Sequence, residues 1–314
     1  MAEPNSPYSR KLTDGHPPFW NVNPLGQTYG LEPNYPCCTV NHPQGYPKFL
    51  SASFVGVGSN GLGHALLSPA KVSTNLASGN KVSVSCDTAY PFGGTLVYTI
   101  SADQAFDFYI RVPGWYVSAS SSISVGGQSQ TLAPDASTGM HKVSVPAGHS
   151  TITYTLGANI VVQPRANDTV AITYGALLYA LEIVESTTVK PAQDWSKQTA
   201  YPDGYAPPQA HDYVIENATV WSVAIDPSTL KVQRGNSTDA TTLPNPIFAL
   251  GASPISMSVR ACEIVWPLWA GLPDIPPKVG DRKCLGTSFE ARLIPYGAAK
   301  LHMAEFPTLD LGGQ

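Results

Sequence analysis

The sequence is short of charge, and it contains neither an internal repeat nor an apolar run long enough to span a bilayer. Charged residues make up only 13% of its 314 residues, and the formal net charge is −4. No basic stripe occurs along the chain. Binding to nucleic acid or to an anionic membrane needs clustered positive charge, so the sequence predicts neither kind of partner.

Because charges are few, the surface must be covered by other polar residues, and Ser, Thr, Asn, Gln and Gly fill this role. Hydrophobic residues make up 43% of the chain, which is enough to build cores and argues against global disorder. The 29 prolines and 27 glycines are spread along the chain. This spacing favours many short strands over long helices.

One helix is expected near residue 50. Residues 1–44 are irregular and too broken by proline to fold alone. After Pro47, which suits the first turn of a helix, apolar residues recur at helical spacing. The pattern predicts a helix over residues 47–55, ended by Gly56, within an N-terminal segment of residues 1–60.

The rest of the chain is predicted to be mainly β. In residues 61–185, short runs alternate apolar and polar side chains between Gly, Asn, Asp and Pro turns. This pattern is typical of an antiparallel, jelly-roll-like sandwich, with Gly126-Gly127 as one hairpin turn. Residues 186–212 are proline-rich and aperiodic, which predicts a linker or long loop. Strand patterns return in residues 213–314, which predicts a second, smaller β unit.

Three cysteines have structural interpretations. Cys262 and Cys284 flank a loop rich in proline and tryptophan, and a disulfide between them is expected in an oxidising compartment. Closing such a loop stabilises a fold by about 3 kcal/mol in the chain-entropy model. Cys86 shares a strand face with Val82 and Val84, so it is predicted to be a buried free thiol.

The compartment is indicated by three Asn-x-Thr triplets, at Asn167, Asn217 and Asn236. Together they favour a secreted protein that is glycosylated at these asparagines. The first residues are polar and contain no signal-peptide core. Two interpretations remain: a sequence that is truncated relative to its secreted precursor, which we favour, or an intracellular protein.

The adjacent cysteines Cys37 and Cys38 are the residues with the clearest chemical potential. Neighbouring cysteines pair poorly with each other because the small ring is strained. Two thiols side by side suit a soft metal, and a metal-bound thiolate can act as a nucleophile. The alternatives are that both thiols pack as small hydrophobic groups or that one forms a disulfide elsewhere.

Three stretches, in the same order, resemble glycoside hydrolase family 127, which includes zinc-containing retaining β-L-arabinofuranosidases. They are Tyr35-Pro36-Cys37-Cys38-Thr39-Val40-Asn41 with the helix after it, Asp87-Thr88-Ala89-Tyr90-Pro91-Phe92-Gly93-Gly94, and Ile110-Arg111-Val112-Pro113-Gly114-Trp115 with the hairpin of residues 122–127. Residues 20–49 are most similar to fungal members. The resemblance is looser beyond residue 185, where it rests on Leu293-Ile294-Pro295-Tyr296-Gly297 and the closing strand.

This resemblance implies an (α/α)6 barrel that carries the active site, followed by β-sandwich domains. Residues 1–60 would be the residual C-terminal end of that barrel. Cys37 would be nucleophile and zinc ligand, and Cys38 a second ligand, in a double displacement through a thioglycosyl intermediate. Zinc holds the sulfur as a thiolate near neutral pH. The substrate would be an arabinose-containing glycan of plant cell-wall type, and the parent family is secreted.

The chain lacks the upstream residues that complete the family's active site. The family completes its zinc shell with an upstream Glu-x-Cys motif and uses a second upstream glutamate as acid/base, whereas no Glu-x-Cys occurs here. Glu32 and His42 are near enough in sequence to be substitute ligands; otherwise they are a solvated loop carboxylate and a turn residue. Acidic residues in strand-rich regions could form a glycosidase pair, but surface charge explains them better. They are Asp103, Asp107 and Glu182.

Two function classes follow. The first is the C-terminal part of a β-L-arabinofuranosidase-like hydrolase, which would be inactive or weakly active as this polypeptide. Its helix near residue 50 would then expose an apolar patch, which the absent barrel or a second copy of the chain would cover. The second is a non-catalytic module that binds carbohydrate through exposed tryptophans; the alternative for each ring is packing in a core or between domains. The candidates are Trp115, Trp195, Trp221, Trp266 and Trp269. A degenerate product without activity is the third reading.

Overall fold

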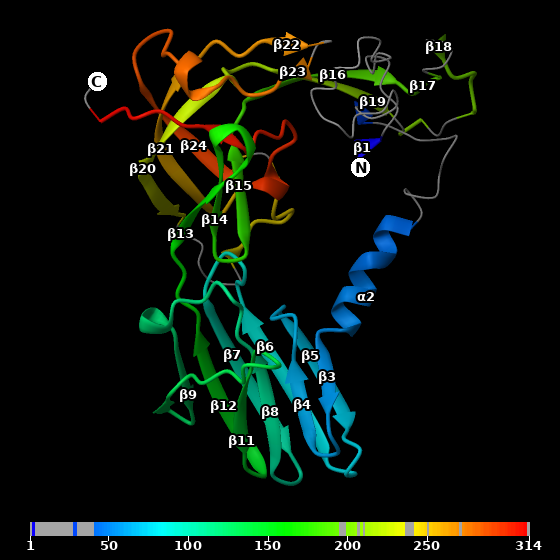
Figure 1. Ribbon diagram of the computed structural model, residues 1–314. Helices are drawn as coiled ribbons and strands as arrows, with labels where there is room; N and C mark the ends of the chain where they lie inside the picture. Colours follow the sequence, from blue (N-terminus) through cyan, green and yellow to red (C-terminus); the bar gives the residue numbers. More distant parts are fainter. Residues whose placement is uncertain are drawn as a thin grey trace.

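The computed structural model describes residues 2–3, 28–29, 41–194, 199–205, 208–209, 211–235, 242–249, 251–269 and 272–312. As predicted, the chain is mainly β, and the described part contains one α-helix, α2 (Gly45–Ser51). Figure 1 shows two β units stacked one above the other, with α2 to one side of the lower unit. Within the described residues, no helix is long and apolar enough to cross a membrane.

The lower unit is a sandwich of two sheets. Its six-stranded sheet has the order β10-β9-β12-β7-β6-β5, and its four-stranded sheet has the order β11-β8-β4-β3. The strands of the larger sheet are β5 (Ala70–Asn75), β6 (Lys81–Thr88), β7 (Thr95–Ala102), β9 (Ser122–Val125), β10 (Gln128–Gln130) and β12 (Gly148–Thr155). Those of the smaller sheet are β3 (Phe54–Val57), β4 (Gly61–His64), β8 (Phe106–Arg111) and β11 (Met140–Val145). All pairings are antiparallel except β4 with β8.

The core of this sandwich follows directly from the period-two pattern. Successive side chains of a strand point to opposite faces, so each strand presents its apolar residues to the facing sheet. In β7, for example, Leu96, Tyr98 and Ile100 are fully buried, while the residues between them face outward. Phe108 and Tyr154 close the core from β8 and β12.

The upper unit is built around a seven-stranded sheet with the order β13-β14-β15-β24-β21-β20, and β25 pairs with β14. Its strands are β13 (Ile160–Pro164), β14 (Thr169–Tyr174), β15 (Leu177–Leu181), β20 (Val223–Arg234), β21 (Ile255–Glu263), β24 (Phe289–Pro295) and β25 (Phe306–Pro307). The expected boundary near residue 185 therefore differs from the structure. Residues 160–181 belong to the second unit because β15 pairs with β24 and β14 with β25.

The predicted linker of residues 186–212 also differs from the structure. Strand β16 (Glu185–Pro191) pairs with β19 (His211–Asn217) over its whole length, and the short strands β2 (Thr28–Tyr29) and β1 (Ala2–Glu3) extend this sheet. Two-residue ladders join β17 (Gln193–Asp194) to β18 (Thr199–Ala200) and β22 (Leu268–Trp269) to β23 (Leu272–Pro273). Short 3-10 helices complete the described elements: η1 (His42–Gln44), η2 (Ser118–Ser120), η3 (Ala166–Asp168), η5 (Val279–Asp281) and η6 (Tyr296–Ala298).

The helix expected over residues 47–55 is displaced toward the N-terminus. It begins at Gly45 and ends at Ser51, and Phe54 starts strand β3 instead of continuing the helix. The reason is tertiary: Phe54 pairs with His64 in β4 and stacks on its ring, with 4.3 Å between the ring centroids. Gly56, predicted to end the helix, lies within β3.

The two β units are joined by a packed junction. Phe92, in the turn after β6, is buried in the core of the upper unit and contacts Phe248 edge-on, with 5.8 Å between ring centroids. Arg234 of β20 donates a 3.2 Å hydrogen bond to the carbonyl of Phe92. Gly94 lies so close to Leu156 that a Cβ would stand 2.3 Å from the Leu156 carbonyl oxygen, so only glycine fits there. The turn thus connects the lower sandwich to the upper core.

Candidate functional site

The cysteine pair predicted to carry the chemistry lies outside the described residues, as does Glu32. His42 begins the 3-10 helix η1, but its side chain is not described. In the sequence, Cys37 and Cys38 lie shortly before Asn41, where the described segment that contains α2 begins. Zinc binding and the nucleophile role therefore stay predictions. Within the described part of the chain, no group of three or more His, Cys, Asp and Glu side chains could hold a metal ion.

Helix α2, which follows the cysteine pair, has no buried residue. Tyr46, Phe49 and Leu50 are 64%, 52% and 53% exposed. A helix in a globular protein normally buries one apolar stripe against a neighbouring element. The exposed apolar patch expected for this region is present, and Phe49 and Leu50 are called the α2 patch.

The acidic residues considered as a glycosidase pair have other roles in the structure. Asp107 forms a 2.7 Å ion pair with Lys142 of β11. Glu182 forms an ion pair with Arg292 of β24. Asp103 is exposed at the end of β7. The interpretation of these carboxylates as surface charge therefore agrees with their surroundings.

A buried polar group lies inside the lower sandwich. The Nδ1 atom of His64 and the hydroxyl of Tyr98 share a 3.0 Å hydrogen bond, and Tyr98 also contacts the thiol of Cys86. Burial lowers the pKa of His64 to about 4, an effect that a backbone contact with Ser68 partly offsets. Burial also raises the pKa of Cys86 to about 12, so this thiol stays protonated and inert. The prediction that Cys86 is a buried free thiol is confirmed.

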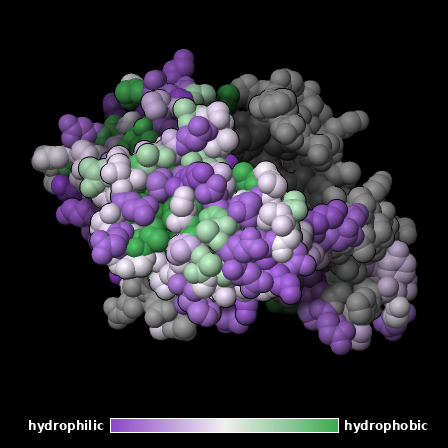
Figure 2. All heavy atoms as spheres, turned by 90° about the horizontal axis from the view of Figure 1, so that it is seen from below, coloured by the Kyte–Doolittle hydropathy of each residue, from purple (hydrophilic) through white to green (hydrophobic). Residues whose placement is uncertain are grey.

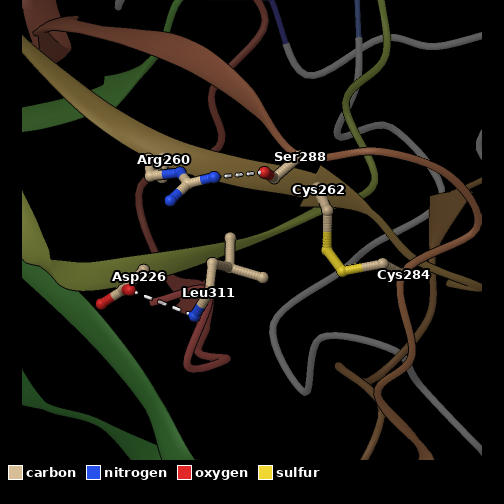
Figure 3. Close-up of a disulfide and its surroundings, with 6 residues drawn as sticks. All are labelled: Asp226, Arg260, Cys262, Cys284, Ser288 and Leu311. Carbon is tan, nitrogen blue, oxygen red and sulfur yellow. Dashed lines mark hydrogen bonds between the residues drawn. A yellow bond between two sulfur atoms is a disulfide. The ribbon is translucent and has the colours of Figure 1, made fainter. Parts of the chain in front are cut away.

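The expected disulfide between Cys262 and Cys284 is present and clips the loop after β21 onto the upper unit. Figure 3 shows two polar contacts beside it, one between Arg260 and Ser288 and one between Asp226 and the backbone of Leu311. Burial alone would raise the pKa of Asp226. Hydrogen bonds from Ser228 and from the N–H of Leu311 outweigh it and lower that pKa below its usual value.

The sequon asparagines differ in their surroundings. Asn167 lies in η3 and donates its side-chain amide to the carbonyl of Pro276, and its own carbonyl accepts a 2.9 Å bond from the buried Arg282. Asn217, at the end of β19, is exposed and bonds the carbonyl of Thr219 at 3.0 Å. Asn236 lies outside the described residues. Asn217 is therefore the more accessible of the two described acceptors.

The described tryptophan side chains are packed against other rings. Trp115 is half-buried, stacks on Tyr90 and lies near Gly175 of the upper unit. Trp221 and Trp266 contact each other, with 5.5 Å between ring centroids, and the indole of Trp266 donates to the carbonyl of Asp274 at 2.7 Å. Packing of this kind leaves none of these three rings as a free sugar platform. Trp195 lies outside the described residues, and the side chain of Trp269 is not described.

A concave site that the sequence did not predict lies at the edge of the six-stranded sheet. It is an open hollow of ≈ 620 Å³, bounded by the Gly126-Gly127 turn, by His149, Ser150 and Thr151 of β12, and by Thr99 of β7. The hairpin turn was expected from the sequence, but the hollow is formed by three strands whose register only the fold reveals. The alternating Ser and Thr residues were the available signal.

The lower sandwich matches a known protein domain. Residues 62–144 match the family model described as the middle domain of GH127 β-L-arabinofuranosidase. No curated protein sequence matches the chain. Three similar solved structures are Ara127N-Se, a GH127 β-L-arabinofuranosidase from Geobacillus stearothermophilus T6 (17% identity, TM-score 0.56), a glycoside hydrolase (15%, 0.56) and the GH127 β-arabinofuranosidase BT3674 (16%, 0.53).

These structures share the fold over most of this chain, because 87%, 88% and 87% of it is covered. The chain in turn spans only 36%, 41% and 38% of their lengths. The closer affinity to fungal members stays a prediction. The match of residues 62–144 to a GH127 middle domain agrees with the family that the sequence motifs indicated.

Proposed function

We propose that this chain is the portion of a β-L-arabinofuranosidase-like glycoside hydrolase that joins the end of the catalytic barrel to its β-sandwich domains. The match of residues 62–144 to the GH127 middle domain carries this proposal. The α2 patch supports it, because an apolar helix that directly precedes this domain lacks a covering element within the described residues. An arabinose-containing glycan of plant cell-wall type is the proposed substrate.

The catalytic role is assigned to Cys37, with Cys38 as its partner in holding zinc. Two thiolates have the right chemistry for zinc but fill half of a tetrahedral shell. Glu32 and His42 carry the nearest oxygen and nitrogen donors in the sequence and are the proposed substitutes. A bound zinc ion would keep both sulfurs deprotonated near neutral pH. The Cys37 thiolate would then attack the anomeric carbon and form a C–S bond as the glycosidic C–O bond breaks, with the departing oxygen protonated by water. Water would afterwards hydrolyse the C–S bond and release the sugar and the thiolate.

As this polypeptide the enzyme should be inactive or nearly so. The sequence holds neither the Glu-x-Cys motif nor a residue identified to protonate the leaving group. General acid catalysis typically contributes about 10²- to 10⁴-fold to a rate. Losing it together with half of the zinc shell should reduce turnover below detection in an ordinary assay.

The decisive experiment measures zinc content and turnover separately. Zinc bound to the purified chain is quantified by elemental analysis for the native sequence and for the Cys37→Ser and Cys38→Ser variants, with Cys86→Ala as a control thiol. Bound zinc that falls in both site variants but not in the control is expected. Hydrolysis of an aryl β-L-arabinofuranoside should be negligible. Zinc content indifferent to both cysteines would refute the site, and robust Cys37-dependent turnover would refute the predicted inactivity.

We also propose that the protein is secreted and glycosylated. The Cys262–Cys284 disulfide supports an oxidising compartment, and the exposed Asn217 is accessible to a glycosyltransferase. Treatment of the secreted protein with peptide N-glycosidase should lower its apparent mass, and Asn217→Gln should remove part of that shift. An unmodified protein would contradict the proposal.

A further inference from the structure

The outer face of the six-stranded sheet has an unusual composition. Along β7, β12 and β9, the side chains on the face away from the core are Thr95, Val97, Thr99, Ser101, His149, Thr151, Thr153, Thr155, Ser122 and Ser124. All but Val97 and His149 carry a hydroxyl, and none carries a carboxylate, ammonium or guanidinium group. The surface seen from the lower end of the sandwich mixes hydrophilic and near-neutral residues, with hydrophobic ones only in small groups (Figure 2).

Strand register arranges these hydroxyls in rows across the sheet. Thr151 pairs with Thr99, which pairs in turn with Ser85 of β6. In a parallel row, Thr155 lies between Thr95 and Ser122. Neighbours on such a face stand about 4.8 Å apart across strands and about 6.7 Å apart along them. We call this surface the hydroxyl face.

The structure gives these hydroxyls no internal role. Thr–Thr hydrogen bonds between strands can stabilise a sheet, which would be the ordinary reason for such rows. Within the described residues, however, the hydroxyls of β7, β12 and β9 on this face form no hydrogen bond with another protein group. The Ser73–Ser83 contact, at 3.0 Å, is confined to the neighbouring strands β5 and β6. The rows are therefore available to an external partner.

From this arrangement we propose that the hydroxyl face, together with the hollow beside Thr99 and Thr151, binds a neutral polysaccharide chain. Each hydroxyl donates one hydrogen bond and accepts others, which complements the hydroxyls of a sugar polymer. The charged side chains that border the rows, Lys71 of β5 and Asp87 of β6, have opposite signs, so a partner with charge of one sign gains no net attraction there. An apolar partner finds no apolar patch. The hollow, with His149 at its edge, provides a concave end for the site.

The composition of the hydroxyl face favours long polymers over single sugars. It carries no aromatic ring, so a single sugar has nothing on which to stack and binds weakly. A long polymer contacts several rows at once, and linked weak contacts raise the overall affinity. The site therefore selects polymers over short oligosaccharides. The hydroxyl face includes neither Cys37 nor Cys38, and binding there does not depend on the proposed catalysis.

Affinity electrophoresis of the whole chain tests the proposal, with arabinan and a neutral β-glucan as probes and polygalacturonate as a charged comparison. Retardation by at least one neutral polymer, and less by polygalacturonate, is expected. Thr99→Val combined with Thr151→Val removes two hydroxyls while keeping shape and strand propensity, and should weaken binding about tenfold. Thr187→Val with Thr188→Val, on the exposed strand β16, is the matched control.

Retardation that falls in the Thr99/Thr151 variant but not in the control supports the site. Retardation by neither neutral polymer, stronger retardation by polygalacturonate, or equal retardation of both variants overturns it. A Cys37→Ser variant should bind as the native chain does, which separates this proposal from the catalytic one. Unchanged melting temperatures show that each variant is folded.

Discussion

Acidification from pH 6.5 to about pH 4 should weaken the lower sandwich through one side chain, His64. This histidine is fully buried between Phe54 and Tyr98, and its pKa falls from 6.5 to about 4 because burial disfavours the charged ring. One pKa unit corresponds to 1.36 kcal/mol, so the difference between the folded and unfolded states is worth about 3 kcal/mol.

The direction of this pH dependence follows from proton binding to His64 in the folded and unfolded chains. Below pH 6.5 the unfolded chain protonates His64, while the folded chain keeps it neutral down to about pH 4. Unfolding therefore takes up a proton in this window, and stability falls as the pH falls. The contribution of His64 is complete above pH 6.5 and is lost by about pH 4. Its steepest slope is about 1.4 kcal/mol per pH unit.

Urea unfolding at pH 4.5, 5.5 and 7.0, followed by tryptophan fluorescence, measures this slope. His64→Gln keeps a hydrogen-bonding group near Tyr98 but does not titrate, so its stability should depend less on pH in this window. Its unfolding free energy at pH 7 should fall by about 1–2 kcal/mol through altered packing. His149→Gln, at an exposed position of β12, controls for loss of a histidine. Equal slopes for the native chain and His64→Gln would refute the reasoning.

Three further predictions concern the upper unit and its junction. Phe92→Ala should lower the free energy of unfolding by about 3–5 kcal/mol and separate the two β units into distinct calorimetric transitions. Phe49→Ala, on exposed α2, is the control and should change the free energy of unfolding by less than about 0.5 kcal/mol. A single unshifted transition for Phe92→Ala would contradict this prediction. Reducing the Cys262–Cys284 disulfide should lower stability by about 3 kcal/mol, seen as a lower melting temperature with reductant that a Cys262→Ser/Cys284→Ser variant no longer shows. Asp226→Asn should lower the free energy of unfolding by about 1.5–3 kcal/mol at pH 7. The difference from the native chain should shrink in acid, where the native carboxylate is also neutralised, and a difference independent of pH would argue against a charged Asp226.

Local patterns predicted the strands well, because a two-sided sandwich makes every second residue apolar. The alternation of Val82, Val84 and Cys86 in β6 and of Phe106, Phe108 and Ile110 in β8 matches their burial residue by residue. The disulfide was predictable for a similar reason, since its loop is short and rich in turn residues.

What the sequence could not supply was the choice of partner strands. Residues 177–181 look like the strands before them, but β15 pairs with β24, more than a hundred residues later in the chain. Prolines also misled the prediction over residues 186–212. Pro191 ends β16, an edge strand, where a missing N–H costs little. The helix limit failed because the stacking of Phe54 on His64 outweighed helical spacing.

Buried ionisable groups in the described residues have structural roles. In the described part of the chain from Asn41 onward, three inward-facing ionisable groups have structural roles: Asp226 holds the backbone near Leu311, Arg282 holds carbonyls of the η3 region, and His64 is neutral in the core. The thiol of Cys86 is too basic to act as a nucleophile at neutral pH. These surroundings agree with the proposed function, which assigns the nucleophile to Cys37 in the segment before α2. In the two proposals taken together, the cysteine segment supplies the nucleophile and the hydroxyl face binds the polymer.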